Sequence, residues 1–135
     1  KIDSERQKSQ EELFKIQKFY EEIVEGTNEG IWVTDKNDNL YYTNRGMEKI
    51  TGVKTEDMRG VNILKDIPPE ISNVLEKYYT KAKETLTPVH YDSIPVPITT
   101  GKKSYHSGWI LPQIYNGSFN GAVCTVIDQT KLKEA

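Results

Sequence analysis

Residues 44–60, NRGMEKITGVKTEDMRG, predict two short helices that each end at a glycine. Asn44 is a preferred N-cap residue, and the first helix is expected to stop at Gly52. Thr55 is a second candidate N-cap, and Gly60 ends the turn of helix that follows it. Elements this short cannot form a domain alone, so the flanking sequence decides what they pack against.

The residues before this stretch alternate between apolar and polar, which is typical of β-strands. Residues 30–34 and 40–43 are the predicted strands, and the polar residues 35–39 form the turn of a hairpin. The turn, DKNDN, resembles the start of a calcium loop. It has Leu40 where that loop needs glycine and Gly46 where it needs glutamate, so we interpret it as a polar turn without metal.

A longer helix and three strands are predicted after the stretch. Pro68 and Pro69 mark the start of the helix, because proline is tolerated in a first turn. Strand 89–98 contains two prolines and is predicted at an edge, whereas strand 119–127 is apolar on both faces and is predicted to be central. With strand 103–114 between them, the order indicates an α+β fold with a five-stranded antiparallel sheet. The apolar face of the long helix comprises Ile71, Val74, Leu75, Tyr78 and Ala82.

The N-terminal residues 1–25 predict an amphipathic helix. Ser9 and Glu12 match a capping box, which places the firm part of the helix from about residue 10. The helix either packs on its own domain or pairs with a second copy as a coiled coil, and the sequence does not decide between them. Its apolar stripe follows a 3-4-3 spacing and comprises Leu13, Ile16, Tyr20 and Ile23.

Composition excludes several classes of function. The net charge of −2 provides no basic surface for nucleic acid, and no stretch approaches the roughly 20 apolar residues of a membrane span. One cysteine and two histidines leave little material for a zinc site or an activated nucleophile, and we therefore expect no enzyme activity from this segment. The lone thiol and the absence of a signal peptide favour a cytoplasmic location.

Three segments together resemble the PAS domain family, over residues 20–130. They are residues 44–60, the WILP sequence at 109–112, and GAVCTVIDQT at 121–130, which ends in an Asp-x-Thr pattern. The resemblance implies a five-stranded sheet whose inner face, with the short helices, encloses a pocket, and whose outer face is covered by a flanking helix. It also implies a sensory or interaction module that often dimerises within a larger signalling protein.

The resemblance divides the chain into a linker helix (1–25), the PAS domain (26–128) and the start of a signalling helix (129–135). The expected function is to bind a small ligand in the core and relay its state through the flanking helices, within a cytoplasmic protein such as a two-component sensor histidine kinase. The alternative is a ligand-free module for protein interaction and dimerisation. The expected partners are a second copy, bound through the N-terminal helix, and an output domain in the same chain.

The resemblance also suggests which cofactors are disfavoured. Haem-binding members carry a histidine on the long helix, and residues 69–85 contain none. Blue-light flavin members carry a reactive cysteine in the region corresponding to residues 60–66, and none occurs there. Haem and a covalently reacting flavin are therefore disfavoured, and the identity of any other ligand is open.

Alternation along the strands, set beside the family, predicts the pocket and the relay. His106 is the candidate polar group of the pocket, because a neutral imidazole both donates and accepts hydrogen bonds; Trp109 is expected on the outer face. Asp128 is predicted to cap the outgoing helix, and with Thr130 it is the candidate signal relay. The candidate pocket residues are Trp32, Thr34, Val96, His106, Gly108, Ile110, Cys124 and Val126.

Overall fold

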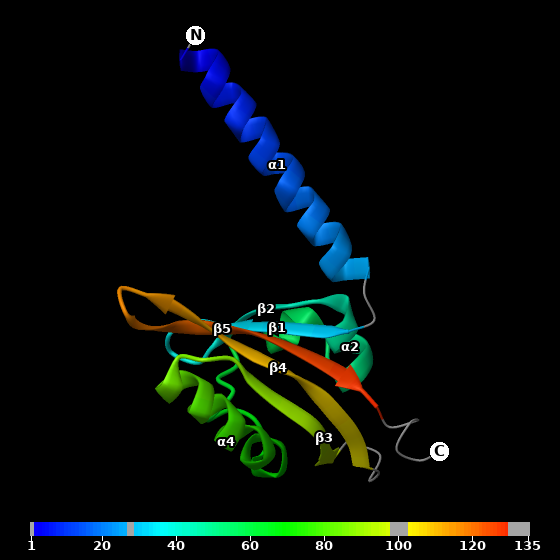
Figure 1. Ribbon diagram of the computed structural model, residues 1–135. Helices are drawn as coiled ribbons and strands as arrows, with labels where there is room; N and C mark the ends of the chain where they lie inside the picture. The colour runs from blue at the N-terminus through cyan, green and yellow to red at the C-terminus, as the bar shows by residue number, and fades with distance from the viewer. Residues whose placement is uncertain (1, 27–28, 98–102, 130–135) are drawn as a thin grey trace.

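The computed structural model describes residues 2–26, 29–97 and 103–129 (Figure 1). Helices and strands follow one another in the predicted order, and the α+β class is confirmed. Their bounds are α1 (Ile2–Gly26), β1 (Gly30–Thr34), β2 (Leu40–Thr43), α2 (Arg45–Thr51), α3 (Thr55–Met58), α4 (Pro69–Thr85), β3 (Val89–Pro97), β4 (Lys103–Tyr115) and β5 (Ser118–Asp128).

The five strands form one antiparallel sheet in the order β2-β1-β5-β4-β3. β5 is central, as its two apolar faces predict, and β3 lies at an edge, as its prolines predict. The pairing of β3 with β4 is irregular between Tyr91 and Ile94, and Ser93 there has a φ of 50°. This bulge allows the edge strand to bend while both of its ends stay paired.

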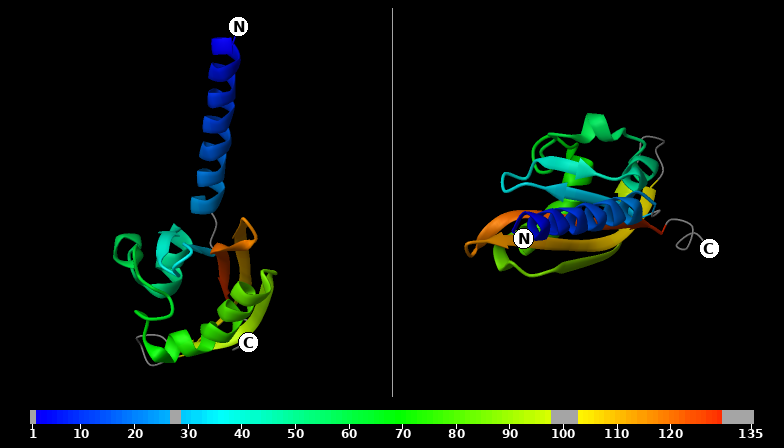
Figure 2. Two further views of the ribbon diagram at one scale, coloured as in Figure 1. Left: turned by 90° about the vertical axis from the view of Figure 1, so that its left-hand side faces the viewer. Right: turned by 90° about the horizontal axis from the view of Figure 1, so that it is seen from above.

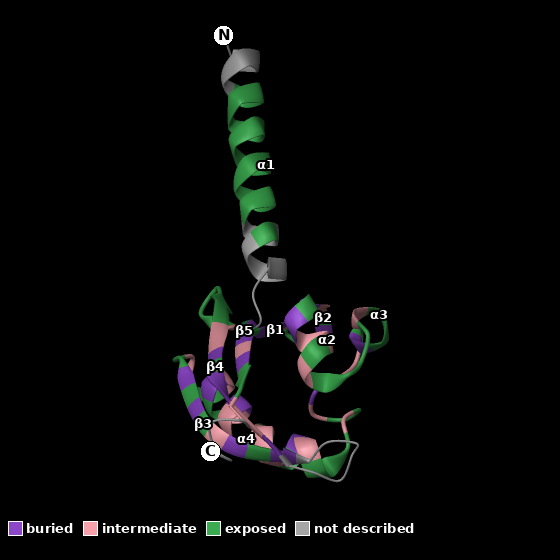
Figure 3. Cartoon of the chain, turned by 90° about the vertical axis from the view of Figure 1, so that its right-hand side faces the viewer, coloured by how far each residue is buried: buried purple, intermediate pink, exposed green. Residues whose placement is uncertain are grey.

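Helix α4 packs against β3 and β4, while α2 lies beside β1 and α3 beside β2. In Figure 3 the buried residues lie along the strands and on α2, α3 and α4. The predicted apolar face of α4 is on the core side, but most of its residues are only partly buried. The buried positions are Ser72, Tyr79 and Ala82, so the centre of the face lies one residue further along the chain than predicted. The hydroxyl of Ser72 obscured this face in the sequence, since a polar residue interrupts the apolar pattern.

Helix α1 differs from the prediction in two ways. It begins at Ile2 and not near residue 10, because the residues before Ser9 include strong helix formers and no glycine or proline. It projects away from the sheet (Figures 1 and 2) and does not cover the outer face: Leu13 is 66% exposed, and Trp109 on the sheet is 46% exposed. Most of the surface of α1 is charged or polar, so only its narrow apolar stripe would be stabilised by burial against the sheet.

The side chains of Tyr20 and Ile23, which complete the predicted stripe, lie outside the described residues. Within the part of the chain that is described, no helix combines the length and the apolar character needed to cross a bilayer.

Candidate functional site

The eight predicted pocket residues come together on one face of the sheet. They lie on β1, β3, β4 and β5, and the pairings Trp32 with Cys124 and Ile110 with Cys124 make the wall continuous across three strands. All are buried except His106, which is half-buried. The sheet therefore has an inner wall of these residues, and their role in ligand binding stays a prediction.

Tyr79 of α4 packs directly on this wall. Its side chain is 0% exposed, its ring stacks on Trp32 with the centroids 6.3 Å apart, and Phe119 meets it edge-on at 6.0 Å. Burial raises the pKa of the Tyr79 hydroxyl far above its usual range, so the group is a neutral donor and acceptor at physiological pH. An aromatic side chain thus occupies part of the space that the sequence predicts for a ligand.

The Tyr79 hydroxyl belongs to a buried chain of hydrogen bonds. It donates to Asp38 Oδ1 at 2.8 Å and lies 2.9 Å from Thr34 Oγ1. Thr34 Oγ1 accepts from the Ala122 amide at 3.1 Å, which leaves its own proton for the Tyr79 oxygen. Lys83 Nζ completes the chain at 2.8 Å from Asp38 Oδ2. The network ties α4 to the β1–β2 turn and to β5.

Sequence reasoning did not identify Tyr79, Asp38 or Lys83. A signal for the tyrosine exists, because Ser72, Leu75, Tyr79 and Ala82 follow a 3-4-3 spacing. No comparable signal exists for Asp38, which lies in a polar turn 41 residues away from its tyrosine partner. Only the packing of α4 over the hairpin brings these groups together.

His106 is the polar group at the other end of the wall. Its Nε2 lies 2.9 Å from Ser104 Oγ, and it faces Asp128 across the β4–β5 pairing. Burial lowers the pKa of the imidazole and the charge of Asp128 opposes that shift, with burial the larger effect. The ring is therefore neutral at pH 7 and has both donor and acceptor capacity.

Two further features of the sequence are the thiol of Cys124 and the polar turn at residues 35–39. Burial raises the pKa of the Cys124 thiol well above its ordinary value, so a reactive thiolate does not form there. Asp35 Oδ1 accepts from the amides of Asn37 and Asn39 at 2.8 and 3.0 Å, which is the hydrogen bonding of a polar turn. Among the described residues, no group of three or more metal-ligating side chains of the His, Cys, Asp and Glu types occurs.

Asn44 is the predicted N-cap of α2, and the structure confirms this. Its Oδ1 accepts from the amides of Met47 at 3.1 Å and Ile31 at 2.8 Å, and its Nδ2 donates to the Glu29 carbonyl at 3.0 Å. The side chain is 0% exposed. One residue therefore joins the start of β1 to the start of α2.

The second predicted cap, Thr55, is wrong. Lys54 holds the N-cap position of α3, and the Thr55 amide and hydroxyl both donate to Glu48 Oε1, at 2.9 and 2.7 Å. These hydrogen bonds, the hydroxyl first, lower the pKa of the Glu48 carboxyl. Hydrogen bonds to a carboxylate are stronger than those between neutral groups, so the Thr55 hydroxyl donates to Glu48 and does not accept from an amide of its own helix.

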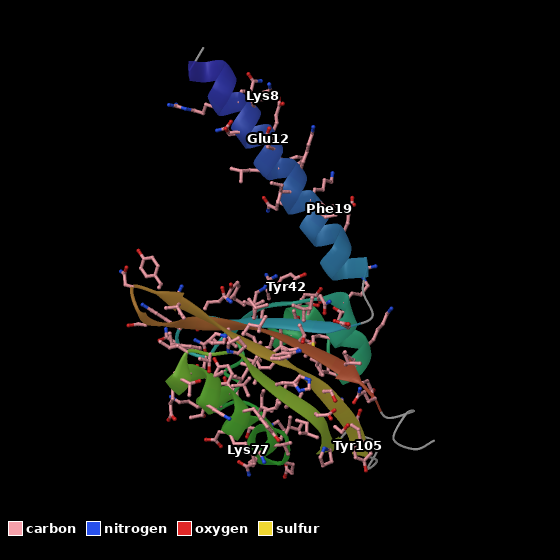
Figure 4. The ribbon with its side chains drawn as sticks, in the orientation of Figure 1. Lys8, Glu12, Phe19, Tyr42, Lys77 and Tyr105 are labelled. Atoms are coloured by element: carbon pink, nitrogen blue, oxygen red, sulfur yellow. The ribbon has the colours of Figure 1, made fainter. Side chains whose placement is uncertain are left out.

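The exit of the domain lies at the end of β5. Asp128 is the last residue of this strand, and the Gln129 amide donates to the Tyr105 carbonyl at 2.7 Å; Figure 4 shows Tyr105 near that end of the sheet. Thr130 and the helix predicted over 129–135 lie outside the described residues, apart from Gln129, which is not helical. The capping role of Asp128 therefore stays a prediction.

Comparisons with known proteins agree with this architecture. The PAS domain of a protein from Colwellia psychrerythraea has a TM-score of 0.72 at 20% identity, over 86% of this chain and 98% of that one. The PAS domain of Bordetella pertussis BvgS has 0.66 at 20% identity, over 93% of each chain. A sensory box sensor histidine kinase from Vibrio cholerae has 0.60 at 17% identity, over 89% of this chain and 97% of that one.

At these identities the structural likeness shows the fold alone. A search among curated proteins gives no match. The family model described as PAS fold matches residues 18–97, which is more than half of the sequence and includes α2, α3, α4 and the first three strands. This chain belongs to the PAS fold family.

Proposed function

We propose that this chain is a signal-relay PAS module that pairs with a second copy through α1 and passes a change of state to the segment after β5. The observation that carries the proposal is the exposure of apolar side chains on α1: Leu13 and Ile16 of the predicted stripe are 66% and 56% exposed, and the neighbouring Phe19 is 63% exposed. Figure 4 shows Phe19 on the part of α1 that stands away from the sheet. A cytoplasmic sensor histidine kinase with its catalytic output elsewhere in the chain fits this role, and the segment itself needs no catalytic activity.

A second copy is the occupant that suits this stripe. At 100° per residue, Leu13, Ile16 and Phe19 lie within about 120° of one another around the helix, which is the width of a helix–helix contact. Full burial of such a side chain contributes about 1.5–3 kcal/mol, and each of these is already partly covered, so each gains about half of that value. Three side chains from each copy are then comparable with the lower part of the roughly 4–15 kcal/mol that association costs. The resulting dimer is of moderate affinity, which suits a relay whose packing must change.

Replacing Ile16 with serine is expected to raise the dissociation constant of the dimer about tenfold. Each half-buried isoleucine contributes about 0.8 kcal/mol, and two are lost per dimer, whereas about 1.4 kcal/mol corresponds to a factor of ten. Sedimentation equilibrium on the 135-residue chain measures this constant. Lys18→Ser, on the opposite side of the helix, is the matched control and should leave the constant unchanged. A chain that is monomeric at all concentrations would refute the proposal.

Ligand binding by the inner wall is the second candidate function. The wall combines apolar side chains with the Thr34 hydroxyl and the neutral imidazole of His106, which is the composition of a small-molecule site. Because Tyr79 fills the part of the wall next to Trp32, the His106 end is where a ligand would displace the fewest packed groups.

A compound that binds there is expected to raise the melting temperature by about 4 °C or more at a hundredfold excess over its dissociation constant. A thermal-shift screen of small metabolites tests this, with His106→Ala as the variant that should lose the response. His90→Ala is the control, because His90 is exposed and its ring packs at a tilt against Trp109 of the outer face. If no compound stabilises the parent chain, the ligand-free relay is the better account.

A further inference from the structure

Four polar residues meet where the chain leaves the sheet, and we call them the exit clamp: Asp92 and Ser93 of β3, Ser107 of β4, and Gln129 after β5. Ser107 is only 4% exposed, although alternate residues on its strand put it on the same face as the exposed Trp109. The other three residues cover it. A polar side chain this buried requires partners, and the clamp supplies them.

The hydrogen bonds of the clamp link β3, β4 and the residue after β5 through one hydroxyl. Ser107 Oγ accepts from the Ser93 amide at 2.7 Å and lies 2.6 Å from Gln129 Oε1 and 2.9 Å from Asp92 Oδ1. Ser93 Oγ lies 3.2 Å from the same two acceptors. The hydroxyl protons of Ser93 and Ser107 are thus shared between Asp92 Oδ1 and Gln129 Oε1. Either hydroxyl can donate to either acceptor, so more than one arrangement is possible. Gln129 is held at its side chain by these hydroxyls and at its amide by Tyr105.

Ser93 gives the clamp a link to the shape of the edge strand. Its φ of 50° is in the left-handed region, which residues with a Cβ rarely adopt, and it sits in the irregular part of the β3–β4 pairing. Such a conformation persists only where surrounding contacts enforce it. The amide of Ser93 donates to the same Ser107 oxygen that holds Gln129, so the bulge and the exit share one hydrogen-bonding centre.

We infer that the exit clamp is a releasable coupling between the β3 bulge and the segment after β5, with Gln129 as its positioning residue. When Gln129 is docked, the residue after β5 is held on the sheet; when the bulge rearranges, Ser107 loses a partner and the hold on Gln129 weakens. This inference deepens the proposed relay, on which its meaning for signalling rests. The test measures only how firmly residue 129 and the bulge are hydrogen-bonded. Its outcome is therefore independent of dimer formation.

The test is amide hydrogen exchange by NMR on the 135-residue chain, comparing the parent with Gln129→Leu, Ser107→Ala and the double variant. Each single variant is expected to speed exchange at the residue 129 amide at least tenfold, and the double variant to add little more, because both remove one interaction. The decisive readout is the Ser93 amide in Gln129→Leu. It should also exchange at least threefold faster, which loss of a merely local contact at the exit would not cause.

Gln113→Leu, on the exposed end of β4, is the matched control and should change neither amide. The Cys124 amide in the centre of β5 reports global stability and should stay constant in all variants. Unchanged exchange at residue 129, fully additive effects of the two substitutions, or an unchanged Ser93 amide in Gln129→Leu would each overturn the inference.

Discussion

Replacing Tyr79 with alanine is expected to lower the free energy of unfolding by about 3–5 kcal/mol, as for other large-to-small changes in a core. The side chain is fully buried between Trp32 and Phe119, so its removal leaves a cavity under α4. It also leaves Asp38 and Thr34 without the hydroxyl that joins them. Urea denaturation at pH 7, followed by tryptophan fluorescence because Trp32 lies against the site, measures the change.

One further variant separates packing from hydrogen bonding at this position, and a second serves as the control. Tyr79→Phe keeps the ring and removes only the hydroxyl, so the expected loss is about 1–2 kcal/mol. Tyr115→Ala, at a side chain that is 67% exposed, is the control and should change stability by less than about 0.5 kcal/mol. If Tyr79→Ala destabilised no more than Tyr115→Ala, the account of Tyr79 as the centre of the core would be wrong.

The second large effect is expected at Asn44, where alanine should lower the free energy of unfolding by about 3 kcal/mol. Loss of an N-cap costs about 0.5–2 kcal/mol, and each buried backbone group left without a partner about 1–3 kcal/mol. The amide of Ile31 and the carbonyl of Glu29 both lose their Asn44 partner, in addition to the amide of Met47. The same denaturation experiment measures the change.

Asn44→Asp divides this effect into its parts. The carboxyl keeps the acceptor for the Ile31 and Met47 amides, but a second acceptor oxygen replaces the donor to the Glu29 carbonyl, so the loss of about 1–3 kcal/mol includes repulsion between these two oxygens. Asn73→Ala, on the exposed side of α4, should have no effect beyond about 0.5 kcal/mol. If Asn44→Ala destabilised no more than Asn73→Ala, the capping role assigned to Asn44 would be wrong.

The sequence predicted the parts of the fold that depend on local chemistry. The order of elements, the α2 cap at Asn44, the edge position of β3 and the central position of β5 all follow from caps, prolines and the period of apolar residues. Alternation also placed the eight wall residues on one face. Each of these patterns spans a few neighbouring residues, so each is present in the sequence before the chain folds.

The errors share the opposite property. The family resemblance implied α1 over the outer face and the sequence predicted Thr55 as a cap, whereas α1 stands away and Thr55 donates to Glu48. In both cases two partners compete, and the outcome depends on which of them the folded chain brings within reach. Local propensity does not contain that information.

The sequence by itself thus determined the family, the order of strands and helices and the composition of the inner wall. The tertiary structure alone decided that Tyr79 packs on part of that wall, and that Asp38 and Lys83 form an ion pair beside it. It also decided that Gln129, and not only Asp128, is held where the chain leaves. The physical reason is that these contacts join residues 22 to 45 positions apart, which only the packing of separate elements brings to hydrogen-bonding distance.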